Sequence, residues 1–282
     1  MKSIAIITYK DAPNLSPSDA VLVKIFEREN INSTPILWDS DTDWSQFESL
    51  IIRSCWDYHT RVAEFRNWCL MLKVKQITVW NPIDIVLWNH EKTYLKDLEV
   101  KGAKIIPTRW YEKGSLIDLK NIFKETGFEK IIIKPTIGAS AHGVLLMDRN
   151  NAENMQAEVN LALENSGIMI QPFIKEVQTG GEISLMFAGK EYTHAIVKFP
   201  KPGHHVGIYD ATVRLIEPDA AIIKEAKRIV EMIDAPILYA RVDGMITAGG
   251  FILNELELIE PYLFFDLYPK GAEKFVEALE SL

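Results

Sequence analysis

The chain has 282 residues, of which 48% are hydrophobic and 25% are charged, and its 39 Asp and Glu residues outnumber 31 Lys and Arg to give a formal net charge of −8. A chain of this length usually folds as two or three compact units, and the composition excludes a disordered protein. The acidic balance and the scattered basic residues exclude nucleic acid as an expected partner.

The first apolar run covers only residues 4–7, which is too short for a signal peptide or a membrane span. We therefore expect a cytoplasmic protein with no membrane partner. The two cysteines, Cys55 and Cys69, lack CxxC spacing and have no histidines at zinc-site intervals. They are interpreted as packing thiols.

Short apolar runs alternate with amphipathic stretches over residues 1–88, and this pattern predicts βαβ units on a parallel sheet. We interpret the segment as an N-terminal α/β domain. Its predicted strands cover 4–7, 35–38, 49–52 and 77–80, and its predicted helices cover 19–29 and 62–72.

Residues 89–174 form the second predicted unit, an α+β lobe. Asn89 is placed to cap a helix through Val100 that ends at Gly102, and a strand follows over 104–106. Further strands are predicted over 131–134, 144–147 and 168–171, with a helix over 152–165. Residues 175–282 form the third unit, with strands over 182–187 and 192–197, a Gly/His/Pro loop over 200–207, a helix over 218–232, a long hairpin and a closing helix.

The loop 138–143 reads GASAHG and joins two predicted strands. A Walker A loop would continue with Lys and Ser or Thr into a helix, so that interpretation is excluded. Small residues can still bring backbone N–H groups close to phosphate oxygens, although an ordinary mobile hairpin loop is the alternative. Strand alternation places Lys134 beside this loop, where it supplies a cation to a phosphate or, as many strand-end lysines do, reaches into solvent.

The hairpin near the C-terminus concentrates charge on one face. Alternation puts Arg241 and Asp243 on one face of its first strand, and Glu255 and Glu257 on one face of the second. A three-residue loop of Ala248, Gly249 and Gly250 would pair Thr247 with Phe251, Asp243 with Glu255, and Arg241 with Glu257.

Neighbouring carboxylates on one sheet face repel unless they are protonated or neutralised. A divalent cation removes the conflict, and oxygen-only ligands favour Mg²⁺. The alternative is a solvent-exposed polar face. We favour the metal site because Val242, Leu256 and Leu258 on the opposite face are apolar and are expected to be buried.

Six segments in chain order resemble the nucleotide and metal motifs of the ATP-grasp superfamily: KTYLKDL (92–98), IIIKPTIGASAHG (131–143), IQPFI (170–174), GGEISL (180–185), ARVDG (240–244) and NELELIEP (254–261). The N-terminal strings IIRSCWDYH (51–59), WNP (80–82) and IPT (106–108) are similar to small ATP-grasp carboxylate–amine ligases of the cycloserine-biosynthesis cyclo-ligase type, and more distantly to D-alanine ligase and glutathione synthetase. The resemblance implies an α/β ATP-grasp fold, in which a Rossmann-like domain precedes two α+β lobes that clasp ATP.

The resemblance also implies roles for individual residues. Lys92 and Lys134 would contact the nucleotide phosphates under a flap that includes Gly138, Ala139, Ser140 and Gly143. The adenine pocket would be lined by Gln171, Pro172, Phe173 and Ile174, and Glu182 would accept hydrogen bonds from the ribose. Asp243, Glu255 and Glu257 would hold Mg²⁺, and Arg241 would stabilise charge on the reacting carboxylate.

The substrate contacts are less defined by the sequence. The cycloserine-like group has an arginine in a loop where this chain reads KFPKPGHHV (198–206), so Lys198 or Arg214 is expected to substitute. His204 and His205 are interpreted as solvent-exposed rather than catalytic. Arg53 follows a predicted strand at the sheet edge where ligands bind, so it contacts a substrate carboxylate or forms a local salt bridge to Asp57 or Glu64.

The function that these residues predict is a Mg²⁺- and ATP-dependent ligase that joins a small carboxylate to an amine through an acyl phosphate, with an intramolecular cyclo-ligase as one form of the reaction. A nucleotide-binding protein without chemistry and an ATP-grasp kinase are the alternatives. The sequence leaves the acid, the amine and the oligomeric state open, including a homodimer.

Overall fold

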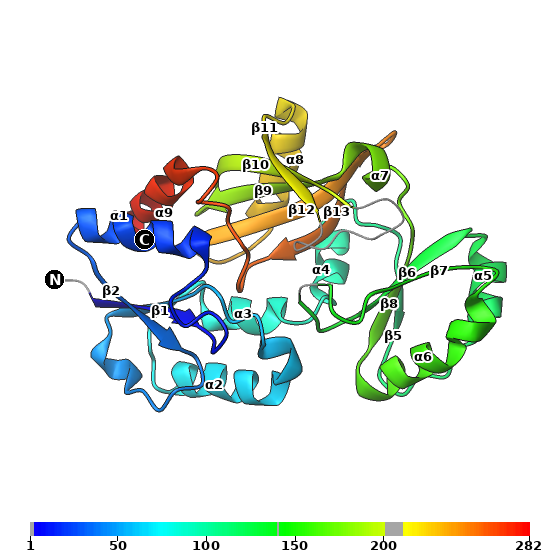
Figure 1. Cartoon of the computed structure of the whole chain (residues 1–282), viewed down its shortest axis with the longest axis horizontal. Coiled ribbons are helices and arrows are strands. Elements are labelled where there is room, and N and C mark those ends of the chain that lie inside the picture. The colour runs from blue at the N-terminus through cyan, green and yellow to red at the C-terminus, as the bar shows by residue number, and fades with distance from the viewer. Residues whose placement is uncertain (1–2, 140, 201–210) are drawn as a thin grey trace.

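The structure is a computed structural model that describes residues 3–139, 141–200 and 211–282. Its N-terminal part is a parallel four-stranded sheet in the order β2-β1-β3-β4, as the alternating sequence pattern predicted (Figure 1). Two short 3₁₀ turns, Trp44–Gln46 and Tyr58–Thr60, lie in its connections. The elements are β1 (Ser3–Thr8), α1 (Pro17–Arg28), β2 (Asn32–Leu37), β3 (Ser49–Ile52), α2 (Val62–Val74) and β4 (Val79–Trp80).

The connection to the second unit differs from the prediction. Two short helices, α3 (Ile83–Asn89) and α4 (Tyr94–Val100), replace the single helix expected after Asn89. The Asn89 side chain does not cap a helix, because its Nδ2 donates to the Leu256 carbonyl at 2.8 Å and its Oδ1 accepts from the Leu258 N–H at 2.9 Å. The expected strand over 104–106 is an isolated bridge between Ile105 and Leu253.

The second sheet is antiparallel, in the order β5-β8-β6-β7, and carries α5 and α6 on one face at one end of the molecule (Figure 1). Neither β5 nor α5 was predicted from the sequence, and β5 has only three residues, too few to show an alternation. Its elements are β5 (Arg109–Tyr111), α5 (Leu119–Thr126), β6 (Lys130–Pro135), β7 (Leu145–Asp148), α6 (Ala152–Asn165) and β8 (Ile168–Pro172).

The third sheet is antiparallel and five-stranded, in the order β11-β10-β9-β12-β13. The edge strand β11 was not predicted, and the loop before it lies outside the described residues. The elements are α7 (Val177–Gly180), β9 (Glu182–Ala188), β10 (Glu191–Phe199), β11 (Thr212–Ile216), α8 (Ala220–Glu231), β12 (Tyr239–Thr247), β13 (Gly250–Glu257) and α9 (Pro269–Ser281).

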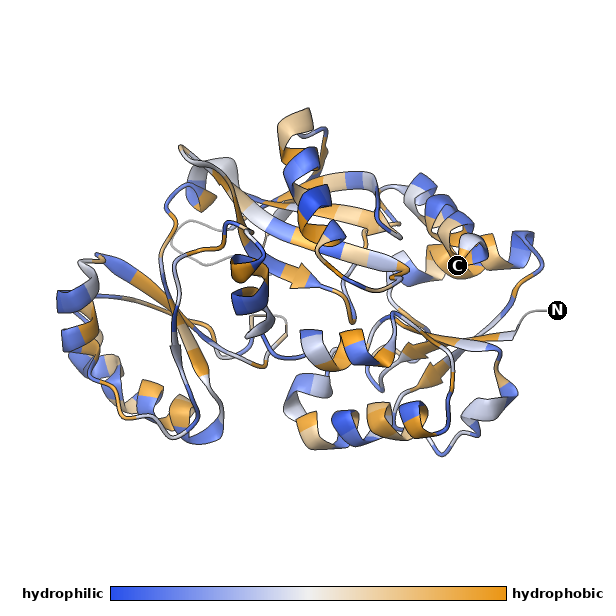
Figure 2. Ribbon diagram, turned by 180° about the vertical axis from the view of Figure 1, so that it is seen from behind, coloured by the Kyte–Doolittle hydropathy of each residue, from blue (hydrophilic) through white to orange (hydrophobic). Residues whose placement is uncertain are grey.

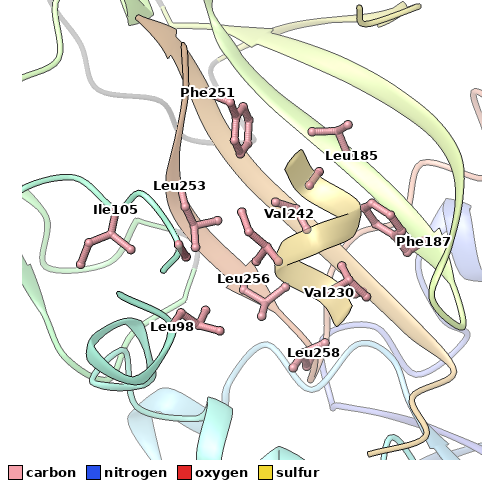
Figure 3. Close-up of a cluster of buried hydrophobic side chains, with 14 of the residues drawn as sticks. Leu98, Ile105, Leu185, Phe187, Val230, Val242, Phe251, Leu253, Leu256 and Leu258 are labelled. Atoms are coloured by element: carbon pink, nitrogen blue, oxygen red, sulfur yellow. The ribbon is translucent and has the colours of Figure 1, made fainter. Parts of the chain in front are cut away.

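The largest core packs one face of the third sheet against α8. Figure 3 shows Val242 and Leu256 of the hairpin facing Val230 of α8, with Leu98 and Ile105 beside them. The apolar hairpin face predicted from alternation is therefore buried, and the segment 94–106 packs with the third sheet rather than with the second. We still propose three units, each built around one of the three sheets.

The two ends of the chain pack together. Helix α9 lies beside α1, and its residue Phe275 shares a core with Ile4 and Ile6 of β1 (Figure 1). Hydrophilic and hydrophobic residues are interspersed along the helices (Figure 2), which is typical of helices that bury one face. None of the helices formed by the described residues combines the length and apolar character that a membrane span requires.

Candidate active site

The cross-strand pairs of the charged hairpin are those predicted, but the turn that joins the strands differs from the predicted one. Thr247 pairs with Gly250, so the turn contains two residues rather than three, but a bulge at Asn254 restores the register. Asp243 therefore faces Glu255 and Arg241 faces Glu257, as predicted. A β-bulge adds one residue to one strand and redirects its side chains.

The bulge requires a glycine on the opposite strand. A Cβ atom at Gly244 would lie 2.4 Å from the Ile252 carbonyl oxygen and 2.4 Å from the Phe251 ring, which is closer than non-bonded atoms approach. The bulge also brings Asn254 and Glu255, which are adjacent in sequence, to the same cavity. Asn254 was not among the predicted site residues, because strict alternation does not put it on the same face as Glu255.

The site is a cavity of about 400 Å³ lined by residues of all three units. Strands β6, β9, β10, β12 and β13 contribute charged side chains, the flap and the segment between α3 and α4 contribute further residues, and the N-terminal unit contributes aromatic residues. The polar and charged residues that line it are Asn89, Lys92, Lys134, Glu182, Lys198, Arg241, Asp243, Asn254, Glu255, Glu257 and Glu260.

Asp243 lies at the centre of a buried charge network. The Arg241 guanidinium donates to it from Nε at 3.0 Å and from Nη2 at 2.8 Å, and Nη2 also donates to Glu257. Lys198 lies 3.4 Å from Asp243 and donates to Glu182 at 2.7 Å. Arg241, Asp243 and Lys198 are each almost fully buried, so these charges depend on one another for stability.

The network shifts the pKa values of its members in the expected directions. Burial opposes the charge of Asp243, but Arg241 and then Lys198 outweigh it and hold the pKa of Asp243 well below its usual range. Burial likewise opposes the charge of Arg241, and Asp243 and Glu257 outweigh it, so the pKa of Arg241 is raised. Both groups are therefore ionised at neutral pH.

The flap lies over the cavity and is tied to it by Lys92. The Lys92 ammonium donates to the Gly138 carbonyl at 2.7 Å and pairs with Glu255 at 2.8 Å. Gly138 and Ala139 line the cavity, whereas Ser140 lies outside the described residues. The His142 ring lies 5.4 Å from that of His59, so the flap reaches the N-terminal unit. Gly143, at the end of the flap, has a φ of +71°.

Lys134 lies between the cavity and a narrow crevice. Its ammonium donates to Asn254 Oδ1 at 2.8 Å, and Asn254 Nδ2 donates to Glu182 Oε1 at 2.5 Å. All three residues line both spaces. The crevice is otherwise apolar apart from Gln171, and its lining includes the predicted residues Gln171, Pro172, Phe173 and Ile174 together with Ile106, Ile132, Val177 and Met245.

The donor atoms fit Mg²⁺ held jointly by the protein and by phosphates. In the described ranges no group of three or more His, Cys, Asp or Glu side chains is close enough to hold a metal ion alone. Mg²⁺ usually takes only one or two carboxylates and completes its shell with water and phosphate oxygens. Burial, opposed by Arg241 and reinforced by Asp243 and Glu255, raises the pKa of Glu257 to about 7. This excess of negative charge is what a divalent cation would relieve.

Arg53 does not line the cavity. It is fully buried, its Nε pairs with Asp19 at 2.8 Å, and its Nη2 donates to the Pro261 carbonyl at 2.5 Å. The predicted salt bridge to Asp57 or Glu64 is wrong, because Arg53 pairs with Asp19 instead. Asp19 is 34 residues away in the chain, so the local sequence did not indicate this partner. Since its guanidinium has no exposed surface, we no longer propose a direct contact between Arg53 and the substrate.

Of the two other predicted substrate residues, one lines the cavity and one does not. Lys198 lies in the cavity wall. Arg214 is exposed on β11, with its guanidinium 5.9 Å from the centroid of the Phe199 ring, and it does not line the cavity. His204 and His205 lie outside the described residues. Cys55 and Cys69 are free and buried, as predicted.

Two family models match the chain. The N-terminal domain of D-cycloserine synthetase DcsG matches residues 4–81, and the ATP-grasp domain of prokaryotic glutathione synthetase matches residues 113–260. The second match covers the flap, the charged hairpin and all of the crevice lining except Ile106. The resemblance inferred from the motifs is therefore confirmed.

Individual proteins give the same result. The cycloserine biosynthesis protein DcsG of Streptomyces lavendulae is 31% identical over a 258-residue match, and the match covers 86% of this chain and 86% of that protein. The crystal structure of D-cycloserine synthetase DcsG has a TM-score of 0.87 and 27% identity over 98% of both chains. D-alanine–D-alanine ligase from Bacillus anthracis, complexed with ATP, has a TM-score of 0.68 and 17% identity over 100% of this chain and 97% of its own, which shows a shared fold.

Proposed function

This chain belongs to the ATP-grasp ligases, which are ATP-dependent enzymes that form C–N bonds, and we propose that it joins a small amino-acid-like carboxylate to an amine through an acyl phosphate. The observation that carries the proposal is the cavity in which Lys92, Lys134 and Arg241 lie beside the carboxylates of β12 and β13. Similarity to the cycloserine biosynthesis protein DcsG supports an intramolecular cyclisation as one form of the proposed reaction.

The crevice and its mouth suit a nucleotide. We propose that adenine occupies the apolar crevice near Phe173 and Ile174, with Glu182 accepting from the ribose hydroxyls. The phosphates then lie between Lys134, Lys92 and the flap. These cations and the small flap residues supply the positive charge and the N–H groups that phosphate oxygens require.

We propose that Glu255, Glu257 and Asp243 hold Mg²⁺ together with the phosphate oxygens. Bound there, the metal would neutralise phosphate charge and orient the transferred group. We propose that the flap over the cavity excludes water during the reaction, which would protect a reactive acyl phosphate from hydrolysis.

In the proposed reaction a substrate carboxylate oxygen attacks the γ-phosphorus, the bond to the β-phosphate bridging oxygen breaks, and ADP leaves. The amine nitrogen then attacks the acyl carbon, inorganic phosphate leaves, and the nitrogen loses a proton. Arg241 is placed to stabilise negative charge on the carboxylate oxygens. Neither cysteine serves as a nucleophile in this scheme, since burial raises the pKa of both thiols.

Oxygen labelling tests the chemistry. With ¹⁸O in the substrate carboxylate, one labelled atom is expected in the released phosphate, and ADP is the expected nucleotide product. Mass spectrometry of the phosphate and chromatography of the nucleotides measure both. AMP and pyrophosphate, or unlabelled phosphate, would reject the acyl phosphate, and a stable phosphorylated product would identify a kinase.

Replacement of Lys134 by methionine is expected to weaken Mg-AMPPNP binding about 10- to 100-fold, which is the range for loss of a charge-assisted hydrogen bond. The fold should persist, because burial already lowers the pKa of this lysine and its hydrogen-bond partner among the described residues is the neutral Asn254. Calorimetry measures the affinity. Lys130→Met, on an exposed residue of the same strand, is the control. Equal affinities of the Lys134→Met variant and the wild type would show that Lys134 does not contact the nucleotide phosphates.

A further inference from the structure

The charges that line the cavity are paired, with two exceptions. Among the described residues of the lining, Lys134 is the one cation without a carboxylate partner, and Glu260 is the one carboxylate without a cation partner. Lys134 borders the crevice, where the proposed function places phosphates. Glu260 therefore marks a second part of the cavity, where a bound ligand would need a positive charge.

Glu260 is held in place by its backbone. Its carbonyl oxygen accepts from Trp56 Nε1 at 2.9 Å, and the neighbouring carbonyls of Ile259 and Pro261 accept from Tyr239 at 2.8 Å and from Arg53 at 2.5 Å. Three consecutive carbonyls are thus fixed by side chains from β12 and the N-terminal unit. This is a rigid support for a functional side chain, and it gives the buried Arg53 a positioning role.

The Glu260 side chain itself has no partner. It is 9% exposed, it lines the cavity, and its carboxyl oxygens make no hydrogen bond or ion pair with any described residue. A carboxyl group in this position is costly unless a ligand pairs with it. Burial, and next the charge of Glu257, raise the pKa of Glu260 well above its ordinary value.

The residues around Glu260 are aromatic. Trp56 and Tyr262 line the same part of the cavity with ring centroids 6.2 Å apart, and Tyr58 also lines it. Aromatic faces attract organic cations, and a carboxylate supplies the full countercharge. None of these aromatic residues borders the crevice, so this part lies on the N-terminal side of the cavity, away from the proposed adenine site.

We infer that Glu260 binds a protonated primary amine of the substrate, which Trp56, Tyr58 and Tyr262 enclose. The inference rests on the proposed function, because it assigns one group of the molecule whose carboxylate is activated. It narrows the substrate class to molecules that carry an ammonium group as well as a carboxylate, as amino acids do. Acids without an amino group are correspondingly excluded from tight binding.

The test measures binding rather than turnover. Saturation-transfer NMR with Mg-AMPPNP present compares small D- and L-amino acids, including serine and alanine, with the matched acids that lack the amino group, 3-hydroxypropanoate and propanoate. At least one amino acid is expected to bind the wild type and its matched acid to bind at least about tenfold more weakly. Glu260→Gln should lose at least about tenfold in affinity for that amino acid, as expected for a charged hydrogen bond, and Glu260→Asp should recover part of it.

The controls separate this inference from general damage. Glu273→Gln, at an exposed residue of α9, should bind like the wild type, and Glu260→Gln should keep its thermal midpoint and its affinity for Mg-AMPPNP. The inference is overturned if the matched acids bind equally, if no amino acid binds the wild type, or if Glu260→Gln changes the Mg²⁺ dependence instead. The proposed function fails separately, when an amino acid that binds produces no ADP in the presence of Mg-ATP.

Discussion

Asp243→Asn is expected to lose turnover about 10²- to 10³-fold or more and to destabilise the fold by about 3–5 kcal/mol. The loss of activity follows from the proposed metal role. The loss of stability follows from the structure, in which this one carboxylate pairs with both Arg241 and Lys198. An amide of the same shape leaves two buried cations with less negative charge beside them.

Urea unfolding measures the stability change, and an ADP assay measures turnover. The pKa of Asp243 is depressed in the folded state, so its contribution to stability is present above the ordinary carboxyl pKa and is lost as the pH falls. The difference between variant and wild type should therefore be large at pH 7 and smaller near pH 3. Asp41→Asn, at an exposed position, is the control. Unchanged stability would show that Arg241 and Lys198 find other partners.

Glu257→Gln is expected to lose turnover to a similar extent but to change stability in the opposite direction. Without Mg²⁺ at pH 8, its thermal midpoint should exceed that of the wild type. The reason is that burial raises the pKa of Glu257 to about 7, so its ionised form is unfavourable even beside Arg241. Glutamine keeps the shape and removes the charge that Asp243 and Glu255 repel.

The sign of the pH dependence follows from the raised pKa. A carboxyl group with a raised pKa contributes stability below its unfolded value, near 4.5, and loses it as the pH rises through about 7. Wild type and variant should therefore unfold alike at pH 4 and differ at pH 8, as circular dichroism with and without Mg²⁺ can measure. A lower midpoint for the variant at pH 8 would mean that the ion pair with Arg241 outweighs the repulsion. Glu273→Gln serves again as the unaffected comparison.

The expected effects of these two variants depend partly on local sequence pattern and partly on contacts that the pattern does not predict. Alternation alone placed Asp243 and Glu257 on one face of the hairpin and predicted mutual repulsion for both. Lys198 reaches Asp243 from β10, 45 residues earlier in the chain. The sequence does not indicate which strand will lie beside β12, so the opposite stability effects could not be foreseen.

The hairpin shows the same division at the level of the backbone. The pairing of Arg241 with Glu257 was predicted from a three-residue turn, and the structure has a two-residue turn with a bulge at Asn254. Both give the same register beyond the bulge, so the prediction held although its geometry was wrong. Only the bulge brings Asn254 into the cavity beside Lys134.

By itself, the sequence determined the parallel N-terminal sheet, the order of the nucleotide and metal motifs, and the charged face of the hairpin, because these depend on periodicities of two or 3.6 residues and on residue types at short spacing. Tertiary structure alone decided that Asn89 binds β13 instead of capping a helix, that Arg53 pairs with Asp19 and supports Pro261, and that Glu260 is left without a partner in the cavity. Each of these depends on contacts between segments far apart in the chain, where burial and the choice among several polar partners outweigh local preference.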